Sequence, residues 1–290
     1  YASHIVGLFP VLAFANIRVV LDCANGAMSD VAPEVFARLG ATVIVLNDRP
    51  NGKNINEGCG ATHPEVVSEA VRLHKADLGL AFDGDGDRVI AVDHIGDVVD
   101  GDHLIALAAI DLHKRGKLKS NSVAVTVMTN AGFHQAMTKA GINVITTPVG
   151  DRNILVAFDE HGVVLGGEQS GHMIFGDFAT TGDGIVSALQ ILRVMIETGQ
   201  PLSELKKVLK KYPQAQRNLR VKDKPDLETI PSLQSLLNEA ESTLKGKGRV
   251  LLRYSGTEPK IRLLLEGREQ DVIDHHADRI AGLLQEAIGA

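Results

Sequence analysis

Asp77-Leu-Gly-Leu-Ala-Phe82 followed by Asp83-Gly-Asp-Gly-Asp-Arg88 is the stretch that decides how this chain is organised. After Asp77 the first half is apolar, which is typical of a buried strand. The second half, here called the acidic loop, carries carboxylates on alternate residues. Two unit charges about 4 Å apart repel by about 4 kcal/mol at an effective dielectric near 20, which favours a bound cation over the alternative, a plain acidic turn between strands. Oxygen ligands without His or Cys predict Mg²⁺ or Ca²⁺ at Asp83, Asp85 and Asp87.

Three familiar loop motifs do not fit this region. An EF-hand that begins at Asp83 needs Gly at its sixth position and Glu at its twelfth, where this chain has Arg88 and His94. A dinucleotide-binding fingerprint fails because Val89 replaces its third glycine. No Gly-Lys-Ser/Thr phosphate loop occurs in the chain. The acidic loop is therefore a divalent-cation site of another kind.

Composition limits the class of protein. The 290 residues are 44% hydrophobic and 23% charged, which is typical of a soluble globular protein of about two domains. A net charge of −6 argues against nucleic acid as the main partner. Cys23 and Cys59 form neither a disulfide framework nor a zinc spacing, so we expect a cytoplasmic protein. The apolar opening, residues 5–15, contains Pro10 and is too short for a membrane span.

Strands and helices alternate along the first half of the chain. Apolar strands that alternate with helices predict a mainly parallel sheet covered on both faces. We expect strands over 17–22, 41–46 and 77–82, helices over 30–39, 64–74 and 102–115, and a hairpin through 89–99.

The same pattern restarts after the Lys/Gly-rich segment 114–121, and a different one follows Pro213. The fold class is therefore α/β: two similar three-layer α/β domains with mainly parallel sheets plus a C-terminal α+β domain. We expect strands over 122–128, 142–146, 163–165, 249–253 and 261–266, and helices over 131–140, 152–161, 184–198, 202–211, 232–244 and 271–287. The predicted divisions are a linker or remnant of a preceding domain at 1–15, and domains at 16–118 (metal), 119–213 (sugar) and 214–290 (phosphate).

A second glycine-rich loop, Gly166–His172, follows a strand of the second unit; we call it the glutamate loop. Ligands of such sheets bind at the carboxyl ends of the strands. Glu168 accepts hydrogen bonds and Ser170 both donates and accepts them, which suits sugar hydroxyls or an amine. A plain turn is the alternative. His172 is a candidate for proton transfer or for a structural role.

A third loop, Arg253–Arg262, lies between two predicted strands of the last unit; we call it the arginine loop. Its two arginines bracket hydroxyls and a glycine that exposes backbone N–H groups, which together suit an oxyanion. The candidate phosphate-binding residues are Arg253, Ser255, Gly256, Thr257 and Arg262. The alternative is a turn whose arginines form surface ion pairs.

Together these loops resemble the α-D-phosphohexomutase superfamily from about Ile17 to the end of the chain. Gln169, with the Cys-Gly-Ala-Thr segment, favours its glucosamine branch over the phosphomannomutase/phosphoglucomutase branch, which usually has Met there. The stretches that carry the resemblance are Asp22-Cys-Ala-Asn-Gly26, Asn54-Ile-Asn-Glu-Gly-Cys-Gly-Ala-Thr62, Phe82 to Arg88, Val149-Gly-Asp-Arg152, Gly167-Glu-Gln-Ser-Gly-His172, Thr180-Thr-Gly-Asp-Gly184 and Arg253-Tyr-Ser-Gly-Thr-Glu-Pro259.

The resemblance implies an isomerase that interconverts glucosamine 6-phosphate and glucosamine 1-phosphate on the route to UDP-N-acetylglucosamine. It implies Mg²⁺ on the three aspartates, Arg88 beside the transferred phosphoryl group, and a sugar held by Glu168 and Ser170. The arginine loop would hold the phosphate that does not react. The implied cofactors are Mg²⁺ and glucosamine 1,6-bisphosphate or glucose 1,6-bisphosphate as activator. The implied partner is a phosphorylated hexosamine, with no nucleic acid and no membrane, and a homodimer is left open.

One departure from the family concerns its phosphoryl carrier. That carrier is a serine in an N-terminal domain, within an Ala-Ser-His-Asn-Pro-like loop. This chain has Ala2-Ser3-His4, but Ile5 and Val6 replace Asn-Pro, so we interpret the match as chance. We therefore expect domains two to four without the first, and a chain inactive by itself. The alternatives are a phosphomannomutase/phosphoglucomutase and a non-catalytic phosphosugar-binding protein.

Overall fold

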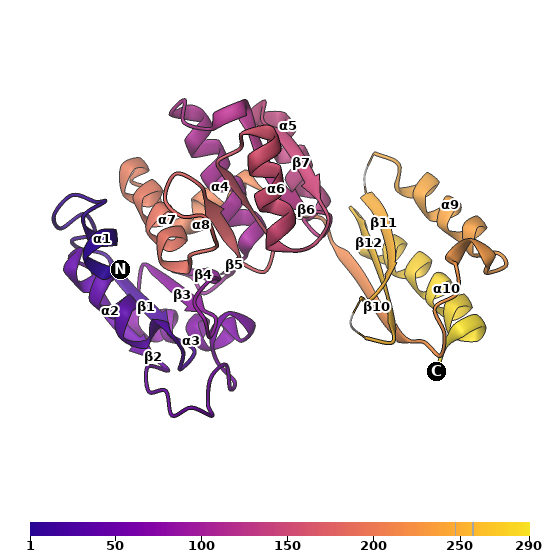
Figure 1. Cartoon of the computed structure of the whole chain (residues 1–290), viewed down its shortest axis with the longest axis horizontal. Coiled ribbons are helices and arrows are strands. Elements are labelled where there is room, and N and C mark those ends of the chain that lie inside the picture. The colour runs from indigo at the N-terminus through magenta and orange to yellow at the C-terminus, as the bar shows by residue number, and fades with distance from the viewer. Residues whose placement is uncertain (247, 257) are drawn as a thin grey trace. The chain divides into compact units, whose positions relative to one another are not determined.

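Three β-sheets carry the fold of the chain, which we describe from a computed structural model (Figure 1). The structure describes residues 1–246, 248–256 and 258–290. Two compact units form: unit 1 contains residues 1–129 and 133–210, and unit 2 contains residues 130–132 and 211–290. Unit 1 holds two of the sheets and unit 2 holds the third.

The first sheet of unit 1 has the strand order β2-β1-β3-β4-β5. Strands β1, β2 and β3 are parallel, whereas β4 and β5 are antiparallel additions at one edge. Both faces are covered: Val19 and Leu21 of β1 belong to one hydrophobic cluster, and Val20 to another that contains residues of α3. The strands are β1 (Arg18–Asp22), β2 (Thr42–Leu46), β3 (Leu78–Phe82), β4 (Val89–Asp93) and β5 (Val98–Val99), and the helices are α1 (Ala2–Val6), α2 (Met28–Arg38) and α3 (Pro64–His74).

The second sheet of unit 1 repeats this plan with the order β7-β6-β8-β9. Again three strands are parallel and the fourth returns antiparallel to the third. The acidic loop joins β3 to β4, and the glutamate loop joins β8 to β9, so each follows the third strand of its sheet. The elements are β6 (Ser122–Thr126), β7 (Asn143–Thr147), β8 (Leu165–Gly167), β9 (Met173–Phe175), α4 (Gly101–Lys114), α5 (Ala131–Ala140), α6 (Asp151–His161), α7 (Gly184–Thr198) and α8 (Leu202–Leu205).

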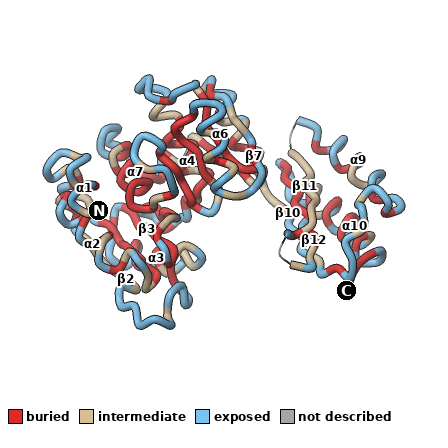
Figure 2. Tube along the Cα trace, viewed as in Figure 1, coloured by how far each residue is buried: buried red, intermediate tan, exposed pale blue. Residues whose placement is uncertain are grey.

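Helices α4 and α7 lie in a core that both sheets of unit 1 share. Leu80 of the first sheet, Val125 of the second and Ile105 of α4 belong to one hydrophobic cluster. Figure 2 shows α4 as a buried helix within this unit. Such all-round burial explains why α4 and α7 are apolar on most of their surface. The domain boundary predicted near residue 118 stays a prediction, since the core continues across it.

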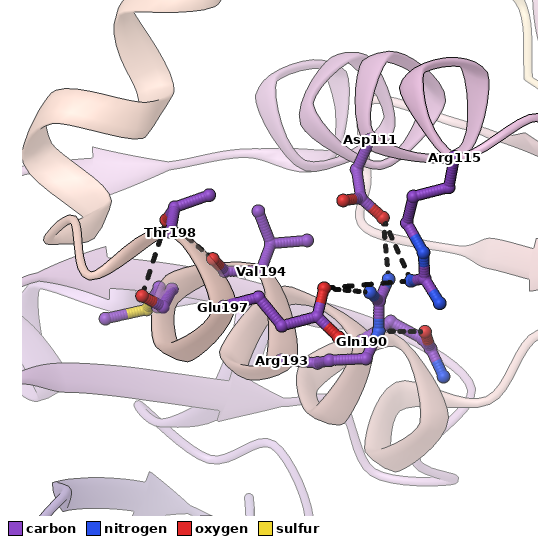
Figure 3. Close-up of polar contacts among 8 residues, drawn as sticks. Asp111, Arg115, Gln190, Arg193, Val194, Glu197 and Thr198 are labelled. Atoms are coloured by element: carbon purple, nitrogen blue, oxygen red, sulfur yellow. Dashed lines mark hydrogen bonds and ion pairs between the residues drawn. The ribbon is translucent and has the colours of Figure 1, made fainter.

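A charged network joins α4 to α7 at the edge of this core (Figure 3). Arg193 donates to Asp111 Oδ2 at 2.7 Å, to Glu197 Oε2 at 2.8 Å and to Gln190 Oε1 at 3.1 Å. Burial by itself would lower the pKa of Arg193, but its bonds to the two carboxylates raise the pKa above the ordinary value. This network fixes the register of the two helices.

Unit 2 is a three-stranded antiparallel sheet, β10-β12-β11, with α9 and α10 on one face (Figure 1). Alternate residues Ile261, Leu263 and Leu265 of β12 pack into the core of this unit. No helix in the described part of the chain is both long and apolar enough to cross a membrane. The elements are β10 (Gln214–Arg220), β11 (Gly248–Tyr254), β12 (Lys260–Gly267), α9 (Leu233–Leu244) and α10 (Gln270–Ile288).

Two expectations about local structure are wrong. The helix predicted over 202–211 ends at Leu205 and continues as a 3₁₀ turn, Lys206–Val208, because Lys206 turns to bond Asp93 and Asp97. The strand predicted over 163–165 is instead Leu165–Gly167, so it enters the glutamate loop. In the second case two glycines concealed a strand, since glycine is a poor strand residue by propensity.

Three other 3₁₀ turns are Gly60–Thr62, Lys119–Asn121 and Leu227–Thr229.

Candidate functional site

The acidic loop brings its three carboxylates together. One oxygen from each of Asp83, Asp85 and Asp87 lies within 4.8 Å of the others. Asp83 Oδ1 accepts hydrogen bonds from the backbone N–H groups of Gly86 and Arg88, each at 3.1 Å. The turn is therefore closed by one of its own carboxylates, which leaves the other oxygens to converge.

The electrostatics of the loop fit a divalent cation. Burial, with the charges of Asp87 and Asp85, raises the pKa of Asp83 to about 6, although the backbone N–H of Arg88 opposes the shift. Asp87 Oδ1 is buried and accepts no hydrogen bond from the described residues. A buried carboxylate oxygen without a donor is unfavourable unless another positive group serves it. Among the described residues the three aspartates form the one acidic or His/Cys cluster with metal-binding geometry.

Arg88 closes the loop next to two of these carboxylates. Its Nε atom lies 3.6 Å from Asp83 Oδ2 and 3.5 Å from Asp87 Oδ1, and 46% of its side chain is exposed. These distances are ion-pair contacts rather than hydrogen bonds. The rest of the guanidinium is thus available to an anion beside the cation site.

The glutamate loop lies directly beside the acidic loop. The backbone N–H of Val89 donates to the carbonyl of Gly171 at 3.1 Å, and Arg88 pairs with His172 in an antiparallel bridge. His172 is buried, and its Nδ1 lies 3.1 Å from Asp87 Oδ2. The sequence could not predict this pairing, because more than eighty residues separate the partners. Burial favours a supporting role for His172 under Asp87 over direct contact with a substrate.

Glu168 and Ser170 are in contact within the glutamate loop, and two further residues hold this loop. Ser170 Oγ donates to Glu168 Oε2 at 3.4 Å, while the backbone N–H of Gly150 donates to Glu168 Oε1 at 3.1 Å. Gln169 Nε2 donates to Asp100 Oδ2 at 3.2 Å. Asp100 is the N-cap of α4, where its side chain accepts from the backbone N–H of His103. Sequence reasoning missed Asp100, although an Asp directly before a helical pattern is a capping signal.

The arginine loop places like charges opposite each other in unit 2. Arg253 of β11 and Arg262 of β12 are cross-strand partners, on the face opposite to the residues that pack on α10. Like charges directly opposite are unfavourable, so this pair favours an anion. Ser255 is buried and Gly256 is exposed. Thr257 lies outside the described residues.

Two charged residues that sequence analysis missed also shape this loop. Lys224 Nζ donates to the carbonyl of Ser255 at 2.6 Å. Glu258 accepts from Lys260 at 2.6 Å and from Arg262 at 3.0 Å. These bonds lower the pKa of Glu258 below its usual value, with Lys260 the larger cause. Glu258 therefore supplies the counter-charge that a bound anion would otherwise provide.

Two repeated α/β sheets followed by an α+β unit with an antiparallel sheet define the fold of the phosphohexomutase class. The chain belongs to the phosphoglucomutase/phosphomannomutase family. It matches that family's alpha/beta/alpha domain II over residues 1–96, its alpha/beta/alpha domain III over residues 100–212 and its C-terminal domain over residues 217–283.

Curated relatives are closely similar in sequence. A phosphoglucosamine mutase of Geobacter metallireducens is 50% identical over all 290 residues, and one of Brevibacillus brevis is 48% identical over 288 residues. The match covers 100% and 99% of this chain and 64% of each relative. The chain thus spans less than two thirds of the length of these relatives.

Solved structures support the fold. A phosphoglucomutase/phosphomannomutase family protein of Burkholderia thailandensis superposes with a TM-score of 0.79 at 22% identity, covering 99% of this chain and 64% of that protein. An N-acetylphosphoglucosamine mutase of Aspergillus fumigatus, in complex with GlcNAc-6P and magnesium, superposes with a TM-score of 0.76 at 21% identity, covering 95% and 62%.

Proposed function

We propose that this chain is the metal-, sugar- and phosphate-binding part of a phosphoglucosamine mutase. The reaction would interconvert glucosamine 6-phosphate and glucosamine 1-phosphate through a bisphosphate intermediate, for UDP-N-acetylglucosamine synthesis in the cytoplasm. The observation that carries the proposal is the bonded pairing of the acidic and glutamate loops. The three aspartates and the Glu168–Ser170 pair thereby lie in neighbouring loops of unit 1, where they would bind a cation and a sugar.

The acidic loop would hold Mg²⁺ through Asp83, Asp85 and Asp87. A bound Mg²⁺ would neutralise charge on the transferred phosphoryl oxygens, which is the main requirement of phosphoryl transfer. Arg88, with its exposed guanidinium next to the carboxylates, would contact the same phosphoryl group. His172 would keep Asp87 in place by the contact at 3.1 Å.

The other two loops would bind the rest of the substrate. Glu168 and Ser170 would hold sugar hydroxyls or the amine, because they offer an acceptor and a donor held 3.4 Å apart. Arg253, Ser255, Gly256, Thr257 and Arg262 would bind the phosphate that does not react. Such a site would accept either phosphate of a glucosamine 1,6-bisphosphate or glucose 1,6-bisphosphate activator.

We further propose that these 290 residues do not turn over by themselves. The family's phosphoryl carrier is a serine of an N-terminal domain. Ser3 lies in α1, where its hydroxyl accepts a hydrogen bond from Arg38 of α2 at 3.3 Å. In an assay of the purified chain with glucosamine 1-phosphate, Mg²⁺ and glucose 1,6-bisphosphate, we expect no formation of glucosamine 6-phosphate. Sustained turnover would contradict the proposal.

Substrate choice is tested on the protein that includes the phosphoserine domain. We expect the highest kcat/KM for glucosamine 1-phosphate. A preference for mannose 1-phosphate or glucose 1-phosphate would instead indicate a phosphomannomutase/phosphoglucomutase. Binding of phosphosugar without turnover of any of the three would indicate a non-catalytic binding protein. Sedimentation of the same sample tests a homodimer.

A further inference from the structure

The acidic loop is enclosed by two segments whose role the proposed chemistry leaves open. One is the turn after β1, residues 22–27, and the other is the long connection, residues 47–63. The backbone N–H of Ala27 donates to the carbonyl of Gly84 at 2.9 Å. A Cβ placed on Gly84 would lie 2.6 Å from the side chain of Ile55 and 2.7 Å from Asn56 Nδ2. These two segments therefore support the acidic loop, and we call them the supporting segments.

A single buried carboxylate ties both segments together. Asp22 is fully buried at the end of β1, and it lies opposite Ala81 of the strand that leads into the acidic loop. Its Oδ1 accepts from the backbone N–H of Ala24 at 2.9 Å, and its Oδ2 accepts from the backbone N–H of Gly60 at 2.9 Å. Both oxygens of a buried charge are thus used to fix backbone, one in each segment.

The bond to Gly60 fixes the long connection where it meets β3. Gly60 has φ +74°, and a Cβ there would lie 2.5 Å from the carbonyl oxygen of Phe82, the residue before the acidic loop. Only glycine fits both the left-handed backbone and this close approach. A shift of Gly60 would therefore displace Ile55 and Asn56, which precede it in the connection and whose side chains pack against Gly84.

We infer that Asp22 is a positioning residue for the cation site. It does not itself belong to the cluster of carboxylates with metal-binding geometry. It holds the two segments that keep the acidic loop in the shape where three carboxylates converge. This inference rests on the proposed role of the acidic loop in binding a divalent cation. Mutation of a residue that orients metal ligands without itself contacting the metal typically weakens metal binding by about 10- to 100-fold.

The test compares two carboxylates at opposite ends of the same sheet, of which Asp22 is buried and Asp77 is exposed. Asp22→Asn replaces one acceptor oxygen with an NH₂ group that faces a backbone N–H. The control is Asp77→Asn, because Asp77 Oδ2 accepts from the backbone N–H of Arg18 at 2.8 Å before β3 begins. Mn²⁺ affinity of the purified chain is measured by electron paramagnetic resonance, at a temperature where each variant is folded by circular dichroism.

We expect Asp22→Asn to weaken Mn²⁺ binding about tenfold and to leave the Gly60 amide open to hydrogen exchange, with Asp77→Asn within twofold of the wild type. Equal affinity in Asp22→Asn and wild type would overturn the inference, as would equal losses in both variants. If the wild type itself binds no Mn²⁺, the proposed cation site fails instead, and the inference with it.

A second variant serves if Asp22→Asn does not fold. Ile55 is 52% exposed, so Ile55→Ala leaves the core intact while it removes the side chain that packs on Gly84. We expect Mn²⁺ affinity to fall about threefold, because the packing on Gly84 is lost while the hydrogen bonds of Asp22 remain. Unchanged Mn²⁺ affinity would show that the supporting segments do not position the acidic loop, which overturns the inference.

Discussion

The acidic loop and the arginine loop concentrate opposite charges in opposite ways. The acidic loop is enclosed around its glycines: Asp83 and the carboxyl oxygen Asp87 Oδ1 are buried, and the side chains of Ile55, Asn56 and Met28 leave no space for a Cβ on Gly84 or Gly86. The arginine loop is open: Gly256 is exposed, and a Cβ there would meet no atom within 4 Å.

The two loops also differ in how their charge is balanced. In the acidic loop the Arg88 guanidinium approaches two carboxylates without a hydrogen bond to either, so one positive charge faces three carboxylates. In the arginine loop Glu258 bonds to Arg262 and Lys260. The excess negative charge of the acidic loop would favour a small cation, whereas a bound anion would compete with Glu258 in the arginine loop.

The largest expected effect comes from replacing Asp83, a proposed metal ligand in the acidic loop. Asp83→Asn keeps an oxygen that accepts from Gly86 and Arg88 but removes a charge, so Mn²⁺ affinity should fall by about 100-fold or more. Calorimetric or resonance titration of the chain measures the affinity. Asp48→Asn, outside the cluster, is the control. Retention of affinity within threefold would mean that the ion binds elsewhere.

The next effect concerns the open loop. Arg253→Ala removes one of the two guanidiniums that β11 and β12 place directly opposite each other. Each charge-assisted bond contributes about 1.5–3 kcal/mol, and we expect glucosamine 6-phosphate to bind about 10- to 100-fold more weakly. Arg217→Ala is the matched control, because Arg217 pairs with Asp274 and Asp278 of α10. Equal losses in both variants would contradict a phosphate site.

The buried charge of the acidic loop should also respond to pH. Because the pKa of Asp83 is raised to about 6, a proton competes with the cation, and Mn²⁺ affinity should fall about tenfold from pH 7 to pH 5. Without metal, the pH dependence of stability has the opposite sign to that of Mn²⁺ affinity. The native state then binds more protons than the unfolded state, so the free energy of unfolding should decrease as pH rises from 4 to 6.

Denaturant titrations across this pH range measure the stability effect. The Asp83→Asn variant should lack the decrease between pH 4 and 6, and saturating Mg²⁺ should reverse it in the wild type at pH 7. An identical pH profile in the variant would show that another group titrates.

The smallest effect tests the internal counter-ion of the open loop. Glu258→Gln releases Arg262 and Lys260 from surface ion pairs, which water and salt screen and which therefore contribute little. Affinity for glucosamine 6-phosphate should therefore increase by about two- to threefold. Glu228→Gln, another exposed acidic residue of unit 2, is the control. A loss of affinity would mean that Glu258 orders the loop rather than competing with the ligand.

Much of the architecture could be predicted from local pattern. The apolar runs of β1, β3 and β6 and the capped helices follow from side-chain periodicity, which is a property of neighbours in sequence. The expectations failed where distant contacts override local preference, as at Lys206, or where glycines of β8 hide a strand. The boundary predicted near residue 118 was set by composition and stays a prediction, while the hydrophobic core of unit 1 contains residues from both sides of it.

The candidate site divides in the same way. The sequence by itself determined which loops are candidates for the chemistry, because alternate aspartates and bracketing arginines concentrate charge of one sign among residues adjacent in the chain. Only the tertiary structure decided that the acidic loop pairs with the glutamate loop through Val89 and Gly171, and that Asp22 anchors the segments beneath it. The physical reason is that each of these contacts has a backbone N–H as its donor, and the N–H groups of Val89 and Gly60 lie far along the chain from the groups that accept from them. A backbone N–H is the same at almost every residue, so no sequence pattern marks its partner.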